Sequence, residues 1–459
     1  MVSNFARQRP WPSLSLMLLG ALIAVLLLAG GASRGDVSGQ AVTRGASCAI
    51  LIVIIAFARM GTLQTVKGPL LILSAAFVLI LSHLIPLPYD MWKLLPGRTV
   101  FAEADVLGGT AQLSRPLAIA PQFAVNAIST LTVPLVVLLL MAGLDEHDRR
   151  WLLSLVLAAV TIAMVAGLLQ FSGVGIDNVF VNDSPGQVSG PLANRNHFAL
   201  LLAIGCLLAP TWALADKAKT GWRIPTAIGL VPLFVLTILA TGSRAGMVLG
   251  VLGLGLGLLV AGGRIRTRIR RAPRWAMFAL VAGIVGVIGI FVLISVAADR
   301  AVSIDRAFAM DTSQDMRSRG LPTVLAMFGT YFPTGYGFGG FDAMFRLGEP
   351  LELLKPSYFN HAHDDWLELA IDAGLPGLVL AGGAVCWWGW STIQAWRRRA
   401  NDDITMARLG SATLLLVMLA SIVDYPARTP VMMAVVAIAA AWLASAQRSA
   451  EASALPQVP

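Results

Sequence analysis

The chain has 459 residues, of which 57% are hydrophobic and only 13% are charged. Soluble globular proteins carry about 25% charged residues, so this composition excludes an ordinary soluble domain. The net charge of +9 is typical of a membrane protein with basic cytoplasmic loops, and no nucleic-acid partner is expected.

Apolar runs recur along the whole chain, and each is long enough to cross a hydrocarbon core about 30 Å thick. A backbone in lipid must satisfy its own hydrogen bonds, so these runs are predicted to be helices. In chain order they cover residues 13–30, 45–58, 68–85, 122–143, 151–170, 196–215, 224–240, 244–262, 275–297, 366–391, 406–423 and 430–446. The sequence thus predicts an all-α polytopic membrane protein with about twelve transmembrane helices in one integral domain, residues 1–459.

Basic residues mark alternate loops between these helices, most densely in "RIRTRIRRAPR" (264–274) and "WRRR" (396–399). Short cytoplasmic loops are enriched in Lys and Arg, so both termini are predicted to be cytoplasmic. The alternative at the start is a signal peptide, because Arg7 and Arg9 precede an apolar run and "AGGAS" (29–33) offers small residues for cleavage. Cleavage there would remove the first helix and leave the remaining orientation unchanged.

Three polar segments lie outside the predicted helices. Residues 86–121 begin "PLPYDMWKLLPGR" and form an extracytoplasmic loop with an amphipathic patch suited to the membrane interface. Residues 298–365 form the largest polar segment, and a loop of this length is usually functional or disordered. Residues 447–459 form a short cytoplasmic tail. We find no separate soluble domain, no repeat and no coiled coil.

Four helices that run from outside to inside begin with unusual polar motifs. These are "NRNH" (194–197), "TGSRAG" (241–246), "HAHDDWLE" (361–368) and "DYPARTP" (424–430). A helix N-terminus presents free N–H groups and about half a positive charge, which suits phosphate. Arginine adds a fork of donors that matches phosphate oxygens. The arginines predicted to bind the anion are Arg195, Arg244 and Arg428 at these helix starts, with Arg317 and Arg319 of "DMRSRG".

Each motif also has a structural interpretation. Asn194, Ser243 and either Asp364 or Asp365 are ordinary helix N-cap residues. Asp365 with Glu368 three residues later resembles a capping box, and arginines near helix ends often extend to lipid headgroups. The occurrence of four such ends on one side of the membrane favours a functional site.

The two histidines at 361 and 363 allow three interpretations. Either could be a general base, because histidine titrates near neutral pH. With Asp364 and Asp365 they could also bind a metal, but the spaced ligands of known zinc sites are missing. The third interpretation is a helix cap with incidental histidines. We expect His363 to be the base, leave His361 unassigned, and expect no metal.

A glycine-rich stretch, "YFPTGYGFGGF" (331–341), lies in the large loop. It is not a dinucleotide fingerprint, because no strand precedes it and it lies on the outer side. Its glycines, Gly335 and Gly337 among them, are expected to permit tight turns close to the membrane or a ligand.

These motifs together resemble the O-antigen ligase and Wzy-type polymerase superfamily of bacterial envelope glycosyltransferases. The resemblance is carried by "IPLPYDMWKLLPGR" (85–98), "GPLANRNHFA" (190–199), "TGSRAG", "PTGYGFGGF" (333–341), "HAHDDWLELAIDAGLPG" (361–377) and "DYPARTP". Their order and spacing along most of the chain are specific to the superfamily.

The resemblance implies a C-type glycosyltransferase-like fold whose large periplasmic loop, between the ninth and tenth helices, carries catalytic elements. The donor would be a glycan on undecaprenyl diphosphate at the outer leaflet of the bacterial inner membrane. The acceptor would be lipid A-core for a ligase, as in lipopolysaccharide, or a growing glycan for an O-antigen or exopolysaccharide polymerase. Membrane lipids and a chain-length regulator are the other implied partners, and no cofactor is implied.

The resemblance also assigns residues. By motif, Arg244 and Arg317 would hold the diphosphate, and His363 would assist the acceptor. The family places a polar Asn, Ser or Gln after this histidine and a G-x-x-G motif further on. Here Gly374 and Gly377 match, but Asp364 is a departure that either raises the basicity of His363 or caps the helix.

Ligase and polymerase activities remain open, because no motif separates them. The alternative from another class is a transporter or flippase of lipid-linked glycans. Such a protein should show paired repeats, broken helices and ionisable residues near the midplane. This chain instead gathers its unusual residues at one face of the membrane. A structural or scaffolding membrane subunit is a third, weaker alternative.

Overall fold

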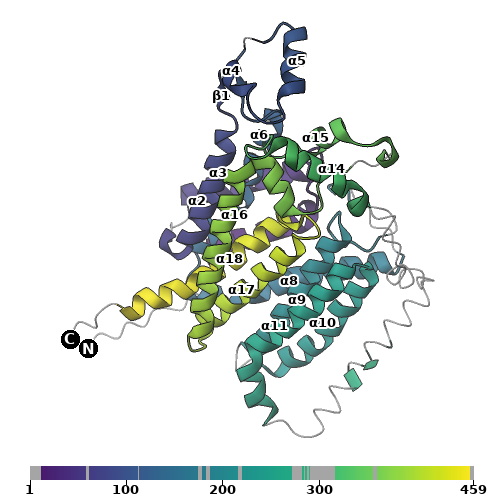
Figure 1. Ribbon diagram of the computed structural model, residues 1–459. Helices are drawn as coiled ribbons and strands as arrows, with labels where there is room; N and C mark the ends of the chain where they lie inside the picture. Colours follow the sequence, from purple (N-terminus) through teal and green to yellow (C-terminus); the bar gives the residue numbers. More distant parts are fainter. Residues whose placement is uncertain are drawn as a thin grey trace.

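The computed structural model describes residues 12–57, 61–111, 113–173, 178–181, 187–215, 220–270, 316–354 and 359–454, together with residues 282, 283, 285, 286 and 289 (Figure 1). In these residues the fold is almost entirely helical. The described strands are β1 (Pro86–Leu87) and β2 (Arg115–Pro116), which pair antiparallel. The predicted all-α class is confirmed.

Nine apolar helical segments among the described residues are long enough to cross a membrane, and two shorter apolar helices accompany them. The elements that form them are α1 (Leu14–Ala29), α2 (Ser38–Phe57), η1 (Leu63–Val66) with α3 (Lys67–Ser82), α6 (Pro121–Thr130) with α7 (Thr132–Ala142), α8 (Glu146–Phe171), α9 (Arg195–Ala213), α10 (Thr220–Thr241), α11 (Arg244–Ile269), α16 (Asp365–Arg397), α17 (Asp402–Ala420) and α18 (Pro430–Ala454). They agree with eleven of the predicted helices. The predicted helix 275–297 lies outside the described residues, apart from the five noted above.

The most buried of these helices is α9, which packs against α8, α10, α11 and α17. Its contact with α11 is close because glycines of α11 face the α9 backbone. A Cβ added at Gly253 would lie 2.5 Å from the carbonyl oxygen of Ala203, and one at Gly257 equally close to that of Leu207. Small residues allow such approach between membrane helices. The "NRNH" motif is thus the start of the most buried of these helices.

The predicted loop 86–121 is a folded hairpin that carries α4 (Tyr89–Trp92) and α5 (Thr99–Leu107) between β1 and β2. In Figure 1 it projects beyond the ends of α3 and α6. Arg98 is fully buried at its base. Its guanidinium donates to the carbonyl oxygens of Leu117 at 2.7 Å and Gly335 at 3.0 Å, so the hairpin is fixed to the glycine-rich stretch.

The large predicted loop is also folded over its described part. It contains α14 (Met316–Tyr331), α15 (Phe341–Gly348) and η3 (Leu351–Leu353), while residues 298–315 lie outside the described ranges. An aromatic cluster forms its own core: Tyr331, Tyr336, Phe341, Phe345 and Phe359. The predicted tail differs as well, because α18 continues as a helix to Ala454.

Helix α16 is interrupted at Gly374, where φ is +57°. The glycine-rich stretch lies against this break: the Leu375 N–H donates to Pro333 O at 2.8 Å, and the Gly337 N–H donates to Asp372 O at 2.9 Å. A Cβ on Gly374 would lie 1.9 Å from Pro333 O, and one on Gly335 would lie 2.4 Å from Asp372 O. These glycines therefore permit backbone contact, as expected for a tight turn.

Candidate functional site

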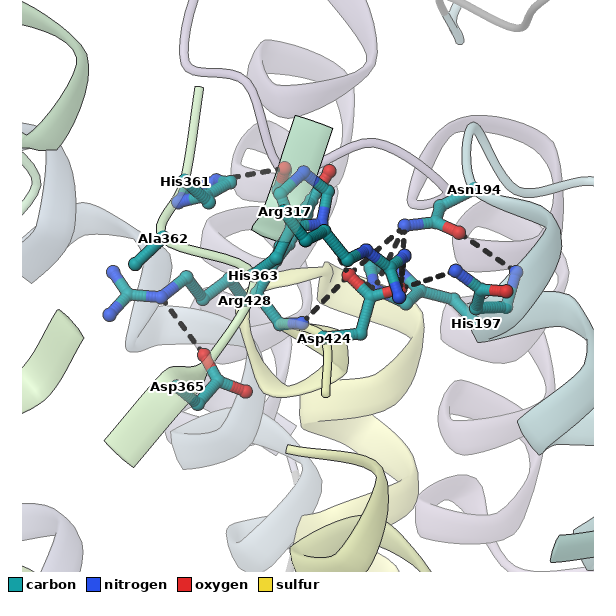
Figure 2. A network of polar contacts seen from close by, with 12 residues as sticks. Asn194, His197, Arg317, His361, Ala362, His363, Asp365, Asp424 and Arg428 are labelled. Carbon is teal, nitrogen blue, oxygen red and sulfur yellow. Dashed lines mark hydrogen bonds and ion pairs between the residues drawn. The ribbon is translucent and has the colours of Figure 1, made fainter. Parts of the chain in front are cut away.

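The site is built around Asp424, which follows α17 and is 3% exposed. Its carboxylate accepts from Arg317 Nη2 at 3.0 Å, from His363 Nδ1 at 3.1 Å and from Asn196 Nδ2 at 2.7 Å (Figure 2). Burial favours a higher pKa for Asp424, but its neighbours His197, His363 and Arg317 outweigh burial and hold its pKa well below the usual range. Asp424 is therefore an ionised carboxylate inside the protein.

The starts of α9 and α11 are joined to this carboxylate. Ser243 caps α11 by accepting from the Gly246 N–H at 3.0 Å, and its hydroxyl donates to Asn196 Oδ1 at 2.8 Å. Asn196 in turn donates to Asp424. Asn194 caps α9 and also donates to Asp424, at 3.2 Å. The four predicted helix starts are thus brought together around Asp424. Asn194 and Ser243 each cap a helix and also take part in the hydrogen bonds that lead to this carboxylate.

His363 is held in one orientation. Its φ is +55°, a left-handed conformation that is rare for residues other than glycine. Because an ionised carboxylate only accepts hydrogen bonds, Nδ1 of His363 carries the proton shared with Asp424. In the neutral ring Nε2 is then the basic nitrogen. Burial lowers the pKa of His363, and Asp424 opposes this shift. The ring, 18% exposed, is therefore suited to accept a proton.

Of the two roles that the sequence left open for Asp364, its contacts match the helix cap. It is the N-cap of α16, and its carboxylate accepts from the backbone N–H groups of Trp366 and Leu367, both at 3.0 Å. The carboxylate that contacts His363 is Asp424. The physical reason is local: a short acidic side chain directly before a helix is within reach of the free N–H groups of the first turn.

A second polar network lies next to the first and contains Arg428. Its guanidinium contacts Asp365 at 3.0 Å, Glu368 at 3.0 Å and Asp372 at 3.4 Å. Glu368 and Asp372 are fully buried. Figure 2 shows Arg428 pointing toward Asp365 and away from Asp424. Burial favours a lower pKa for Arg428, but the three carboxylates raise it. These donors face three internal carboxylates, and the anion-binding role of Arg428 stays a prediction.

His361 belongs to this second network. Its Nδ1 lies 2.9 Å from Glu368 Oε1, and its Nε2 lies 3.1 Å from the hydroxyl of Ser33. The Ala362 N–H donates to Glu368 Oε2 at 2.7 Å. The predicted capping box of Asp365 and Glu368 is therefore wrong. Glu368 instead fixes the segment that carries the histidines, while Asp365 binds Ser421 and Arg428.

Tyr425 joins the two networks through its ring. The ring centroid lies 4.3 Å from that of His361, 4.9 Å from that of His363 and 4.9 Å from that of His197. Three histidine rings from two distant parts of the chain therefore pack on one tyrosine, which limits the rotation of His363.

The remaining predicted arginines are Arg195, Arg244 and Arg319. Arg195 and Arg244 are the first residues of α9 and α11 and are exposed, beside the joined helix starts. Arg319 donates to the carbonyl oxygen of Glu352 at 2.8 Å, which ties α14 to η3. A Cβ added at Gly377 would lie 2.7 Å from the Cβ of Ala373. The predicted anion-binding residue Arg317 contacts Asp424.

The two histidines do not converge on a metal position. His361 faces Glu368 and His363 faces Asp424, and the described residues contain no group of three or more His, Cys, Asp or Glu side chains that could hold a metal ion.

Asp424, Asn196 and His197 were not assigned a role from the sequence. Asp424 and His363 are 61 residues apart, and no spacing rule connects them. The available signal was weaker: Asp424 is an acidic residue at the outer end of an apolar helix, and ionisable residues at a membrane edge are functional candidates.

Residues 229–382 match the sequence model of the O-antigen ligase family, Wzy_C. No curated protein matches the chain. The matched segment contains Arg244, Arg317 and His363, whereas Asp424 and the "NRNH" motif lie outside it. The fold and this match agree with the resemblance found in the sequence. The match over residues 229–382 makes this part of the chain similar to the O-antigen ligase family and supports the resemblance.

Proposed function

We propose that the protein transfers a glycan from an undecaprenyl-diphosphate donor to a saccharide hydroxyl at the periplasmic face of the bacterial inner membrane. The superfamily match supports glycan transfer in general. The donor lipid, the face of the membrane and the acceptor belong to the proposal.

The observation that carries it is the meeting of Arg317 and His363 on one carboxylate. Their nitrogens lie 3.0 Å and 3.1 Å from the oxygens of Asp424. Glycosyl transfer from a diphosphate needs cations for the leaving group and a base for the acceptor. Arg317 is a cation suited to phosphate, and His363 is an oriented imidazole with a basic Nε2, so both requirements are met side by side.

The reaction then proceeds in one displacement. His363 Nε2 takes the proton of the acceptor hydroxyl, whose oxygen bonds to the anomeric carbon of the donor sugar. The bond between that carbon and the diphosphate oxygen breaks, and its electron pair stays on the diphosphate. Arg317 and Arg244 stabilise the charge that develops there, with Arg195 at the neighbouring helix start. The imidazolium afterwards returns its proton to the leaving diphosphate or to water.

The proposed topology has both termini in the cytoplasm, as the distribution of basic loops predicts. The helix starts that carry the site then face the periplasm, and the prenyl chain of the donor stays in the bilayer. An acceptor on lipid A-core would make the protein a ligase, and a glycan acceptor would make it a polymerase that works with a chain-length regulator.

Reconstitution tests this proposal. The purified protein is placed in liposomes with a defined undecaprenyl-diphosphate glycan and, in separate reactions, lipid A-core or a second lipid-linked glycan. We expect a covalent product with one of the two acceptors, and none with His363→Ala at equal protein level. If neither acceptor yields a product while the folded protein binds the donor, the assignment as a transferase is wrong.

One observation favours the alternative of a transporter or flippase. Helix α16 is broken at Gly374, and broken helices are a feature of transporters. However, the break is filled by hydrogen bonds to the glycine-rich stretch. The two functions are separated in the same liposomes, since a flippase would move the lipid-linked glycan across the bilayer without forming a new glycosidic bond.

A further inference from the structure

The two groups that the proposed reaction uses share one partner. Asp424 Oδ2 accepts from Arg317, and Asp424 Oδ1 accepts from His363. Donor diphosphate and Asp424 therefore compete for the same guanidinium. An arginine that turns its donors to phosphate oxygens weakens its ion pair with the carboxylate.

We propose that Asp424 is a positioning residue that couples donor binding to the base: the diphosphate draws Arg317 away from Asp424, and the carboxylate then acts more strongly on His363. This inference rests on the proposed function, since it takes the donor to be a prenyl diphosphate. Its consequence is an order of events, because the imidazole becomes the stronger base only after the donor is in place.

The coupling is strong because the carboxylate is 3% exposed. In such surroundings a charge is poorly screened, so the loss of one counter-charge acts on the neighbours that remain. The remaining contacts are His363, His197 at 3.6 Å, the side-chain amides of Asn194 and Asn196, and the backbone N–H of Tyr425 at 3.0 Å. The side chains of the asparagines carry no charge. The loss of the Arg317 counter-charge therefore acts mainly on the histidine rings.

The charged and titratable groups around His363 come from four parts of the chain. Arg317 approaches from α14, Asp424 from the segment after α17, His361 from its own segment, and His197 from α9 through Asp424. Tyr425 and Phe359 cover the ring, with centroids at 4.9 Å and 5.1 Å. Burial lowers the pKa of His363, Asp424 raises it, and Arg317 lowers it. Withdrawal of Arg317 therefore raises the pKa of His363.

Histidine NMR tests the coupling directly. The full chain contains five histidines, so a protein labelled at histidine Cε1 in lipid nanodiscs gives few signals, and His363→Gln assigns the relevant one. Its titration midpoint is measured with and without farnesyl diphosphate, a short prenyl diphosphate, whose binding is followed separately by its ³¹P signal. We expect an upward shift of the midpoint when the probe is bound.

Two variants separate coupling through Asp424 from the direct field of the probe. In Asp424→Asn the upward shift should shrink or vanish, whereas a direct field would leave it intact. In Arg317→Gln the midpoint should already be higher without any probe, a readout that does not depend on the folding of the Asp424 variant. Arg346→Gln removes a loop arginine that pairs with Asp342 and serves as the matched control, with a response equal to that of the natural chain.

The outcomes discriminate between the two proposals. Binding of farnesyl diphosphate without a shift of His363, or a full shift in Asp424→Asn, would overturn the coupling and leave the proposed function standing. Failure of the natural chain to bind the probe would overturn the coupling together with the prenyl-diphosphate donor.

Discussion

Nδ1 of His363 lies 3.1 Å from Oδ1 of Asp424, although 61 residues separate them in the sequence. The acidic neighbour of His363 along the chain, Asp364, is occupied with backbone N–H groups of α16. The two carboxylates near this histidine thus have separate roles, one toward the imidazole and one toward the helix, and this division can be tested.

Asp424→Asn should lower glycan transfer by about 10²-fold or more, because the amide no longer supplies the negative charge that orients and stabilises the imidazolium. Asp364→Asn should retain nearly full activity, since asparagine caps helices as well as aspartate does. Transfer rates in liposomes, at matched amounts of folded protein, give the comparison. The reverse ranking would return the role to Asp364.

Arg244→Ala is expected to reduce transfer by about 10²-fold or more, the loss typical of one preorganised group that stabilises transition-state charge. Arg317→Lys should also be poor, because a lysine keeps the charge and loses the fork of donors. Both variants should insert into the membrane normally. Arg346→Gln, in α15 next to the α14 helix of Arg317, is the control for unspecific loss of charge. Full activity of either test variant removes that arginine from the mechanism.

The pH dependence of kcat/KM should show an acid limb below pH 6.5, the ordinary pKa of histidine. Burial lowers the pKa of His363, and the neutral ring is the base, so activity is complete above that pKa and is lost as pH falls through it. Asp424 has a pKa held well below its usual range, so the stability it contributes persists until more acidic pH.

The acid loss of activity should consequently be reversible when the pH is restored. Residual activity in His363→Gln should lack this limb. A limb that remains in that variant, or an irreversible loss at the same pH, would assign the titration to another group or to unfolding.

Arg428→Gln should destabilise the protein by about 3–5 kcal/mol, because it leaves carboxylates of a buried ion-pair network without their cation. The affected groups are Asp365, Glu368 and Asp372. Thermal unfolding in detergent, followed by size-exclusion chromatography, measures the effect. Arg428→Gln combined with Glu368→Gln should recover part of the loss. A normal unfolding temperature together with lost donor binding would instead restore Arg428 to the anion site.

Gly374→Ala should disrupt the site from a distance. The residue has φ of +57°, and an added Cβ would lie 1.9 Å from Pro333 O, so the glycine-rich stretch could not remain against α16. Gly382→Ala in the same helix is the matched control, because its Cβ would meet nothing within 4 Å. We expect loss of folded, active protein only for the first variant, measured as above. Equal behaviour of the two would show that the break is not needed.

The sequence by itself determined the class of fold and the region of the site. The apolar runs are long enough to span a bilayer, and a backbone in lipid has few alternatives to the helix. The polar motifs also predicted Arg244 and His363 at helix starts and Arg317 in the large loop. The helix starts of α9 and α11 do lie joined through Ser243 and Asn196. These features depend on local composition and on the alternation of helices, which a sequence carries directly.

Only the tertiary structure decided which charged groups are partners. His363 pairs with Asp424 rather than with Asp364, and Arg428 binds the carboxylates of Asp365, Glu368 and Asp372. Near a helix start, an acidic side chain can cap backbone N–H groups or pair with a distant cation, and sequence spacing does not distinguish the two. The choice is made by the packing of α9, α16 and the segment after α17, because it fixes which side chains lose water together and so must satisfy one another.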